Sequence, residues 1–265
     1  MASTSQRHDQ MAQYPNAALL SVKWNHCHRL VDPDNNDNTE RLNDFEAAVT
    51  EDVNSLKGCL RTHFNIRNTH DFVVKRERNM VRKKKPYRAD PVIGAITTAA
   101  GTLEEDDLFI FFYSGFGERA PGAGAELNFA NGKRGRYFGC DPIFAALKAL
   151  PCDVLVILDC CNAVNLATNP IRSAGEMQNK KMIIIGASLE TDETTGMAGR
   201  TMTKRLVDVL NESRGRELLS TRDIAARVNQ KTAQLKAQTG DEAIQDVVVN
   251  AGVANSGDIV LNRLR

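Results

Sequence analysis

Two long apolar runs limit what this chain can fold into. Residues 108–113 read Leu-Phe-Ile-Phe-Phe-Tyr, and residues 154–158 read Val-Leu-Val-Ile-Leu. Neither run alternates apolar and polar residues, so each predicts a strand that is buried on both faces. Strands of this kind belong to parallel sheets that helices cover on both sides.

The segments around these runs alternate between strand-like and helix-like patterns. Apolar residues recur every three or four positions from Leu42 to Phe64, which predicts an amphipathic helix. A second helix is expected from Pro91 to about Leu103, with Asp90 as its N-cap. We expect the Gly-rich stretch 115–139 to be a loop. Further strands are expected at 18–24, 72–74, 182–186 and 258–261, and further helices at 143–150, 201–210 and 221–235.

This order of elements predicts an α/β fold with three layers, in which helices flank a mostly parallel open sheet. The chain has 265 residues, of which 42% are hydrophobic, enough for one substantial core. No apolar run approaches the roughly 20 residues that a membrane-spanning helix needs. We expect a disordered tail over residues 1–15 and a single domain over residues 16–265.

The net charge and the cysteine content indicate which binding partners and which cellular compartment to expect. The net charge is +1, which gives no field favouring nucleic acid or an anionic membrane. Six scattered cysteines without a secretion signal indicate reduced thiols and a cytoplasmic protein. The basic run 82–85 could act as a nuclear-import signal or be a solvated loop. The triplet 26–28, His-Cys-His, lacks a second ligand pair at zinc spacing, so no metal site is expected.

The two apolar runs end in unusual sequence. Residues 114–117, Ser-Gly-Phe-Gly, follow the first run, and residues 159–163, Asp-Cys-Cys-Asn-Ala, follow the second. In open parallel sheets, ligands bind outside the carboxyl ends of the strands. Glycines there expose backbone N–H groups, and a cysteine at the neighbouring strand end would face the same crevice. The pattern predicts a cysteine nucleophile beside an oxyanion-binding amide.

Together these two stretches resemble the catalytic domain of caspases and metacaspases. Residues 107–117 are similar to the family's strand that ends in Ser-Gly-His-Gly, and residues 154–162 to the strand that ends in Asp-(Ser/Cys)-Cys-His. Position 161 follows position 116 by 45 residues, near the roughly 50 that separate the caspase histidine and cysteine. The resemblance implies a large-subunit-like part over about 16–170 and a small-subunit-like part over about 180–265.

The resemblance also assigns roles to single residues. Cys161 matches the nucleophile, and the amide of Gly117 would form the oxyanion hole with that of Cys161. Asp159 and Asp52 match the two aspartates that form the metacaspase pocket for an arginine or lysine of the substrate. For Asp52, an exposed carboxylate on a helix is an equal alternative. The Gln-Ala-Cys motif of true caspases is absent, so any pocket should accept cations.

Phe116 stands where the resemblance places the catalytic histidine. A phenylalanine ring can neither activate a thiol as a base nor protonate a leaving amine as an acid. We therefore expect a pseudoprotease that acts as a regulator or scaffold, as a monomer or weak homodimer. It would bind peptides or proteins with a basic residue, and could pair with an active caspase-like relative through the last strand, residues 259–261.

The alternative is an active cysteine endopeptidase that cleaves after basic residues, with Cys161 and another histidine as base. The histidines available for this are His8, His26, His28, His63 and His70. A part in programmed cell death follows from the family likeness by analogy.

No cofactor is expected. Residues 118–140 contain two carboxylates, Glu118 and Glu126, too few for a calcium site of six to eight oxygens. Residues 115–120 formally fit the dinucleotide-binding pattern Gly-x-Gly-x-x-(Gly/Ala). However, Pro121 and Gly122 break the helix that must follow. Nucleotide binding is therefore not expected.

Overall fold

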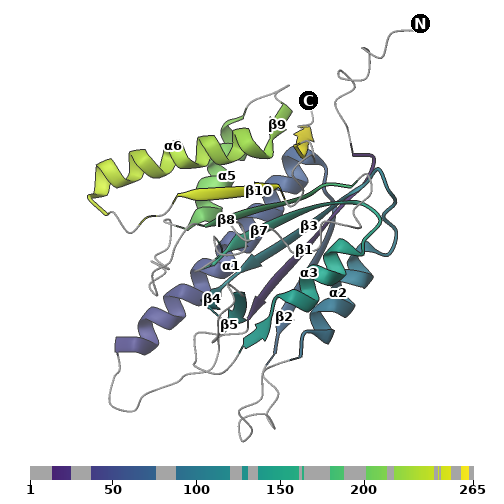
Figure 1. Ribbon diagram of the computed structural model, residues 1–265. Coiled ribbons are helices and arrows are strands. Elements are labelled where there is room, and N and C mark those ends of the chain that lie inside the picture. Colours follow the sequence, from purple (N-terminus) through teal and green to yellow (C-terminus); the bar gives the residue numbers. More distant parts are fainter. Residues whose placement is uncertain are drawn as a thin grey trace, which may run out of the picture.

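A six-stranded sheet runs through the centre of the computed structural model (Figure 1). The structure describes residues 14–24, 37–75, 88–119, 127–130, 137–160, 163, 180–187, 201–213, 218–241, 244, 246–251 and 258–262. The strand order is β10-β8-β7-β3-β1-β2, and every neighbouring pair is parallel except β10 with β8. The strands are β1 (Ala17–Trp24), β2 (Asn68–Val74), β3 (Leu108–Ser114), β7 (Asp153–Asp159), β8 (Met182–Ala187) and β10 (Val247–Ala251).

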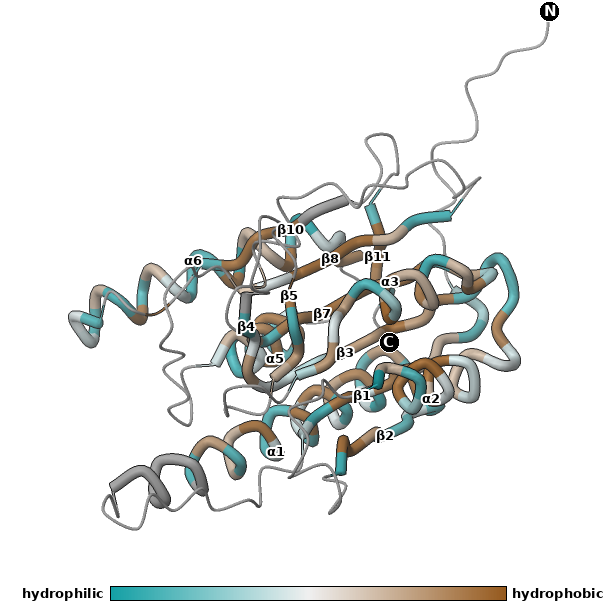
Figure 2. Tube along the Cα trace, turned by 60° about the horizontal axis from the view of Figure 1, so that its bottom comes forward, coloured by the Kyte–Doolittle hydropathy of each residue, from teal (hydrophilic) through white to brown (hydrophobic). Residues whose placement is uncertain are grey.

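Helices cover both faces of this sheet. One face carries α2 (Asp90–Ala100) and α3 (Asp141–Lys148), and the other carries α1 (Asp37–Phe64), α5 (Met202–Glu212) and α6 (Thr221–Thr239). In Figure 2 the central strands are mostly brown, whereas α6 changes repeatedly between teal and brown along its length. This arrangement confirms the predicted fold class, a mostly parallel sheet between two layers of helices.

The apolar run of β3 explains why it lies at the centre. Every residue of β3 is buried, and its side chains alternate between two hydrophobic cores. Phe109 and Phe111 pack with α2 and α3, whereas Ile110 and Phe112 pack with α1 and α5. In β7 the pattern is the same up to Asp159, which is partly exposed at the carboxyl end. The prediction of strands buried on both faces is confirmed.

The stretch 115–139 is not simply a loop. It contains β4 (Phe116–Arg119) and β5 (Leu127–Ala130), which with β6 (Tyr137–Gly139) form a small antiparallel sheet in the order β4-β5-β6. These strands have three or four residues each, too short for an alternating pattern to stand out among the glycines. The loop prediction for this stretch is therefore wrong in part.

The edge of the main sheet also differs from the prediction. The last strand, β11 (Val260–Asn262), pairs with β9 (Leu218–Ser220) in a separate two-stranded sheet. Residues 259–261 therefore lie outside the six-stranded sheet, and pairing with a partner through this last strand stays a prediction. The two edge strands of the main sheet are β2 and β10, and β10 was not predicted from the sequence. At the start of α2, Asp90 is the first helical residue rather than the N-cap, and it pairs with Arg88 at 2.7 Å.

Buried carboxylates hold the amino ends of the central strands. Asp107 is 2% exposed. Its Oδ1 accepts hydrogen bonds from the backbone N–H of Asn16 at 2.9 Å and from the side-chain amide of Asn16 at 3.1 Å. Its Oδ2 accepts a hydrogen bond from the N–H of Glu104 at 2.8 Å. Asp153 Oδ2 accepts from the Tyr14 hydroxyl at 2.8 Å, and its Oδ1 from the Lys181 N–H at 2.7 Å. Burial, with Asp153 beside it, raises the pKa of Tyr14 far above its ordinary value.

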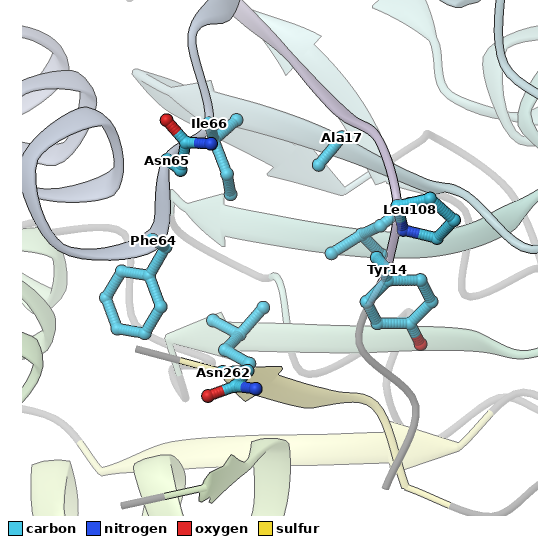
Figure 3. A pocket seen from close by; sticks show the side chains of 9 residues that line it. Tyr14, Ala17, Phe64, Asn65, Ile66, Leu108 and Asn262 are labelled. Atoms are coloured by element: carbon cyan, nitrogen blue, oxygen red, sulfur yellow. The ribbon is translucent and has the colours of Figure 1, made fainter. Parts of the chain in front are cut away.

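A cavity of about 320 Å³ opens at this amino end (Figure 3). Phe64 and Ile66 line it from the end of α1, together with Ala17 and Leu108 from the first residues of β1 and β3. The phenol of Tyr14 is the sole ionisable group among its lining residues. The cavity lies at the edge opposite Ser114 and Asp159, so it is separate from the predicted site.

Replacing Asp107 should destabilise the fold. In Asp107→Ala the N–H groups of Asn16 and Glu104 lose their part-buried bonds to a charged acceptor, which should lower the free energy of unfolding by about 3 kcal/mol. Urea denaturation followed by circular dichroism measures this loss. The neighbouring exposed carboxylate provides the control, because Asp106→Ala should stay within about 0.5 kcal/mol of wild type. Equal losses in both variants would contradict the assigned role of Asp107.

Candidate active site

The two motif strands end side by side. β3 pairs with β7 so that Ser114 lies opposite Asp159. The N–H of Gly115 then donates to the carbonyl of Asp159 at 3.2 Å, which continues the pairing one step beyond the strand. Phe116 follows Ser114 by two residues, just as position 161 follows Asp159 by two. The predicted adjacency of the two strand ends is confirmed.

Gly115 and Tyr113 set the direction in which the chain leaves β3. Gly115 has φ +156°, and a Cβ there would lie 2.9 Å from the hydroxyl oxygen of Tyr113. That hydroxyl is buried and donates to the carbonyl of Phe116 at 2.8 Å, with the carbonyl of Ala130 at 3.2 Å. A side chain at position 115 would push the tyrosine away from these carbonyls. The glycine therefore serves close packing as well as backbone freedom.

Phe116 stacks against a second aromatic ring. It is half-buried, and its ring centroid lies 4.3 Å from that of Phe45 on α1, with 23° between the ring planes. The next residue, Gly117, is buried in β4 opposite Phe129 of β5. The oxyanion role of the Gly117 amide stays a prediction. The partner ring, Phe45, comes from the apolar stripe of the first predicted helix.

The segment of the nucleophile is bracketed by two buried residues. Cys161 itself lies outside the described residues, as do the His-Cys-His triplet and the basic run 82–85. Cys160 is buried with 1% exposure, and Ala163 is fully buried. A Cβ at Gly186 of β8 would lie 3.0 Å from the Cβ of Ala163, so the two segments pack closely.

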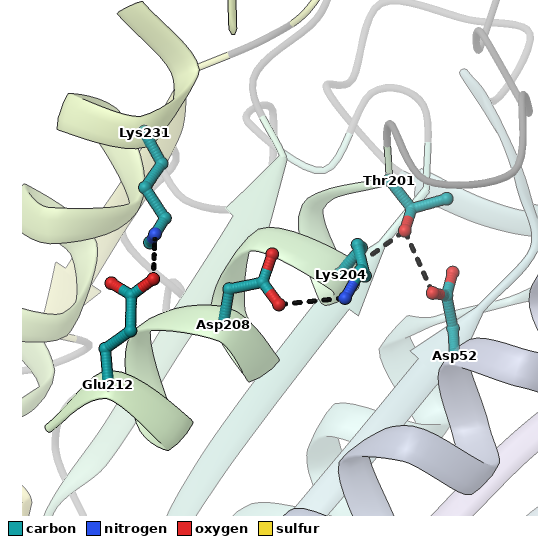
Figure 4. A network of polar contacts seen from close by, with 6 residues as sticks. All are labelled: Asp52, Thr201, Lys204, Asp208, Glu212 and Lys231. Carbon is teal, nitrogen blue, oxygen red and sulfur yellow. Dashed lines mark hydrogen bonds and ion pairs between the residues drawn. The ribbon is translucent and has the colours of Figure 1, made fainter. Parts of the chain in front are cut away.

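The two predicted pocket acids both contact the first turn of α5. Thr201, the N-cap of α5, donates its hydroxyl proton to Asp52 Oδ1 at 2.9 Å (Figure 4). Asp159 Oδ2 accepts from both the N–H (2.8 Å) and the hydroxyl (2.6 Å) of Thr203. Asp52 is 6% exposed, so the alternative that it is an exposed helical carboxylate is wrong. A helix that begins at 201 is predicted from the sequence, whereas the contacts of these threonines with the two acids are not.

The environment of Asp52 favours its protonated form. Burial, and next the negative charge of Asp159, raise the pKa of Asp52 to about 7. The bond from Thr201 and the charge of Lys204 act in the opposite direction, and Glu51 adds a smaller repulsion. No hydrogen-bond donor reaches Asp52 Oδ2 within the part of the chain that the structure describes. Protonated and ionised Asp52 should therefore both be populated near neutral pH.

Arg205 brings a positive charge near Asp159 from inside the fold. It lies on α5 and is 4% exposed. Burial lowers the pKa of Arg205, while the charges of Asp159 and Asp246 oppose that shift. Asp159 thus accepts two hydrogen bonds from Thr203 and lies near the cation of Arg205. Asp52 accepts one hydrogen bond, from the hydroxyl of Thr201 to Oδ1. The two acids differ in how much of their charge the protein compensates.

The described histidines lie away from the carboxyl ends of β3 and β7. His63 immediately precedes Phe64, which lines the cavity at the opposite edge of the sheet. His70 lies on β2, three strands from β7, or about 14 Å at the usual strand spacing. His8, His26 and His28 lie outside the described residues. In the part of the chain that the structure describes, none of the helices is long and apolar enough to span a membrane. The same residues include no group of side chains that could hold a metal ion.

A family model described as the caspase domain matches residues 43–247. The chain belongs to the caspase domain family. This caspase domain also resembles the crystal structure of protein GSU0716 from Geobacter sulfurreducens. The TM-score is 0.52 at 15% identity, and the match covers 89% of this chain and 93% of that one. At this identity the likeness shows a shared fold. A comparison with curated proteins finds no match.

The state of Asp52 predicts how stability depends on pH. From about pH 4 to 7 the folded protein holds a proton on Asp52 that the unfolded chain has lost, so its contribution to stability falls as pH rises. Asp52→Asn removes this dependence. As the pH rises from 4 to 8, the free energy of unfolding of this variant should increase by roughly 2–4 kcal/mol relative to that of wild type.

Urea denaturation at each pH measures the effect. The control is Asp44→Asn, an exposed carboxylate on the same helix, which should follow the wild-type profile. If Asp52→Asn also follows the wild-type profile, Asp52 is not a buried carboxylate with a raised pKa.

Proposed function

We propose that this caspase domain binds peptide or protein segments that present an arginine or lysine, and hydrolyses them poorly or not at all. It would act as a pseudoprotease, a regulator or scaffold within a family of cysteine peptidases. The observation that carries this proposal is the pair of carboxylates, Asp52 and Asp159, held by the first turn of α5 at the carboxyl edge of the sheet.

The pair is suited to a cationic side chain. The negative charge of Asp159 lies close enough to Asp52 to raise its pKa, so a cation between them would relieve the repulsion. Asp52 Oδ2 is buried and has no donor among the described residues, so its capacity to accept a hydrogen bond is unsatisfied. Guanidinium and ammonium groups make strong, charge-assisted bonds with carboxylates. A neutral or acidic side chain would leave this charge uncompensated.

Impaired hydrolysis follows from Phe116. A cysteine thiol with an ordinary pKa near 8.5 has a few per cent thiolate at neutral pH, so attack on a peptide would be slow but not forbidden. Expulsion of the amine needs a proton donor, and a benzyl ring supplies none. The loss of general acid–base catalysis typically costs about 10²–10⁴-fold in rate. The stacking of Phe116 on Phe45 supports an apolar role for this position.

The alternative is an active endopeptidase that cleaves after basic residues and draws its base from another segment. One observation favours it: β1 ends at Trp24 on the same edge of the sheet as Ser114 and Asp159, and His26 and His28 follow within four residues. In that case an imidazole from this segment would have to reach the thiol of Cys161.

Restoring the histidine separates the two functions. We expect Phe116→His to raise kcat/KM on fluorogenic peptides ending in Arg or Lys by at least about 100-fold over wild type, because it returns a proton carrier to the crevice. The added activity should disappear in the double variant with Cys161→Ala. The matched control is Phe45→His, which places the same imidazole on the other ring of the stack and should give no gain. Robust turnover by the wild type that Cys161→Ala abolishes would overturn the pseudoprotease proposal. In that case, loss of this turnover in His26→Ala or in His28→Ala would identify the histidine that acts as the base.

A further inference from the structure

We propose that the pocket of Asp52 and Asp159 is proton-linked: a cationic side chain enters it in exchange for a proton from Asp52, and Thr201 sets the pH at which this exchange takes place. The inference rests on the proposed function, because it takes arginine or lysine as the ligand of the pocket. It adds a regulation of the site and a positioning residue, Thr201, that acts through Asp52.

The first argument is the uneven bonding of the Asp52 carboxylate. Oδ1 accepts the hydroxyl of Thr201 at 2.9 Å, whereas Oδ2 is buried and has no hydrogen-bond partner among the described residues. Figure 4 shows one of the two oxygens joined by a dashed line. A buried carboxylate that keeps its charge without compensation is costly, so either a proton or a cation must neutralise it. The free protein has the first option, and a basic ligand provides the second.

The charged groups around Asp52 do not supply that cation. Glu51 on α1 and Asp159 on β7 are acidic and repel a charge on Asp52. Lys204 on α5 is near enough to attract it, but its ammonium is paired with Asp208 at 2.8 Å (Figure 4). Arg205, also on α5, interacts electrostatically with Asp159. Burial and the charge of Asp159 therefore dominate, and they raise the pKa of Asp52 to about 7.

Thr201 holds the carboxylate with its single hydroxyl proton. Its oxygen accepts the N–H of Lys204 at 3.1 Å as the N-cap of α5, so the proton is free to be donated to Asp52. This bond favours the ionised carboxylate and lowers the pKa of Asp52 against the effect of burial. Removal of the hydroxyl should therefore make Asp52 harder to ionise.

The exchange balances as one proton for one cation. Below pH 7 Asp52 is mainly neutral, and a bound guanidinium or ammonium requires its carboxyl O–H bond to break, with the proton passing to solvent. Above about pH 8 the carboxylate is already ionised, and binding releases no proton. The apparent affinity should then rise about tenfold per pH unit below pH 7 and level off above pH 8.

Isothermal titration tests this with acetyl-Ala-Ala-Arg-amide as the probe, from pH 5.5 to 8.5, in buffers with different ionisation enthalpies. The full chain carries Cys161→Ala so that no turnover interferes. We expect the affinity to follow the profile above, with about one proton released per bound peptide at pH 6 and close to none at pH 8.5. Asp52→Asn should bind weakly, and without dependence on pH.

Two N-cap variants separate the role of Thr201 from simple helix stability. Thr201→Val should move the midpoint of the affinity profile up by about one pH unit, the effect expected from the loss of one hydrogen bond to a charged group, whereas Thr201→Ser should not move it. Ser220 caps α6 in the same way, through the N–H of Asp223, away from the pocket. Ser220→Ala should therefore leave the midpoint unchanged.

The possible failures are distinguishable. If the peptide binds at no pH, the proposed function is wrong. If it binds with constant affinity and no proton release, the acid pocket stands but its link to a proton is refuted. This second outcome is measured on the Cys161→Ala protein alone, so it can be decided even if a threonine variant fails to fold. If Ser220→Ala moves the midpoint as far as Thr201→Val does, Thr201 has no special role.

Discussion

Two carboxylates that share one helix end, the buried Asp52 and the partly exposed Asp159, are the constraint around which this domain is organised. Thr201 and Thr203, two residues apart in the first turn of α5, bind Asp52 of α1 and Asp159 of β7. The contacts join segments 149 and 44 residues apart in the sequence, so they fix a helix and a strand end against the same point. Because both threonines donate hydrogen bonds to these acids, a shift of α5 would disturb the contacts of Asp52 and of Asp159 together.

Helix α1 also contributes an aromatic contact on the same side as Asp52. Phe45 and Asp52 lie seven residues apart on α1, which places them on one face of the helix about two turns from each other. Phe45 covers the ring of Phe116, at the position where the family resemblance puts a histidine. This combination of an acid pair and an aromatic stack is the basis of the proposal that the domain binds a basic side chain without hydrolysing the peptide.

Much of the fold could be predicted from the sequence because burial on both faces leaves a plain signature. The runs at β3 and β7, the helix face of α1 and the adjacency of the two strand ends are all confirmed. The sequence did not reveal β4, β5, β6 and β9, because strands of three or four residues show too little alternation. Strand β10 was not predicted either: it has five residues, three valines followed by Asn250 and Ala251, at an edge of the sheet. In these places, pairing with distant segments decides the structure.

The candidate site was predictable in its parts but not in its connections. Asp52 interrupts an apolar stripe, between Val49 and Val53, and that was the signal that its carboxylate is buried. The bonds from Thr201 and Thr203 depend on where α5 begins relative to β7, which no local pattern encodes. The roles of Cys161, Phe116 and Gly117 remain predictions, whereas family membership and the caspase-like fold are established.

The most direct test of this account is whether the crevice distinguishes a positive charge from a neutral side chain of the same shape. At pH 8, the dissociation constant of a blocked tripeptide with arginine is compared with that of the same peptide with citrulline, which replaces the guanidinium by an uncharged urea group. The acid pair predicts at least about thirtyfold tighter binding of the arginine peptide, or about 2 kcal/mol for a desolvated charge pair. Equal affinities would contradict the central claim that Asp52 and Asp159 recognise a cation.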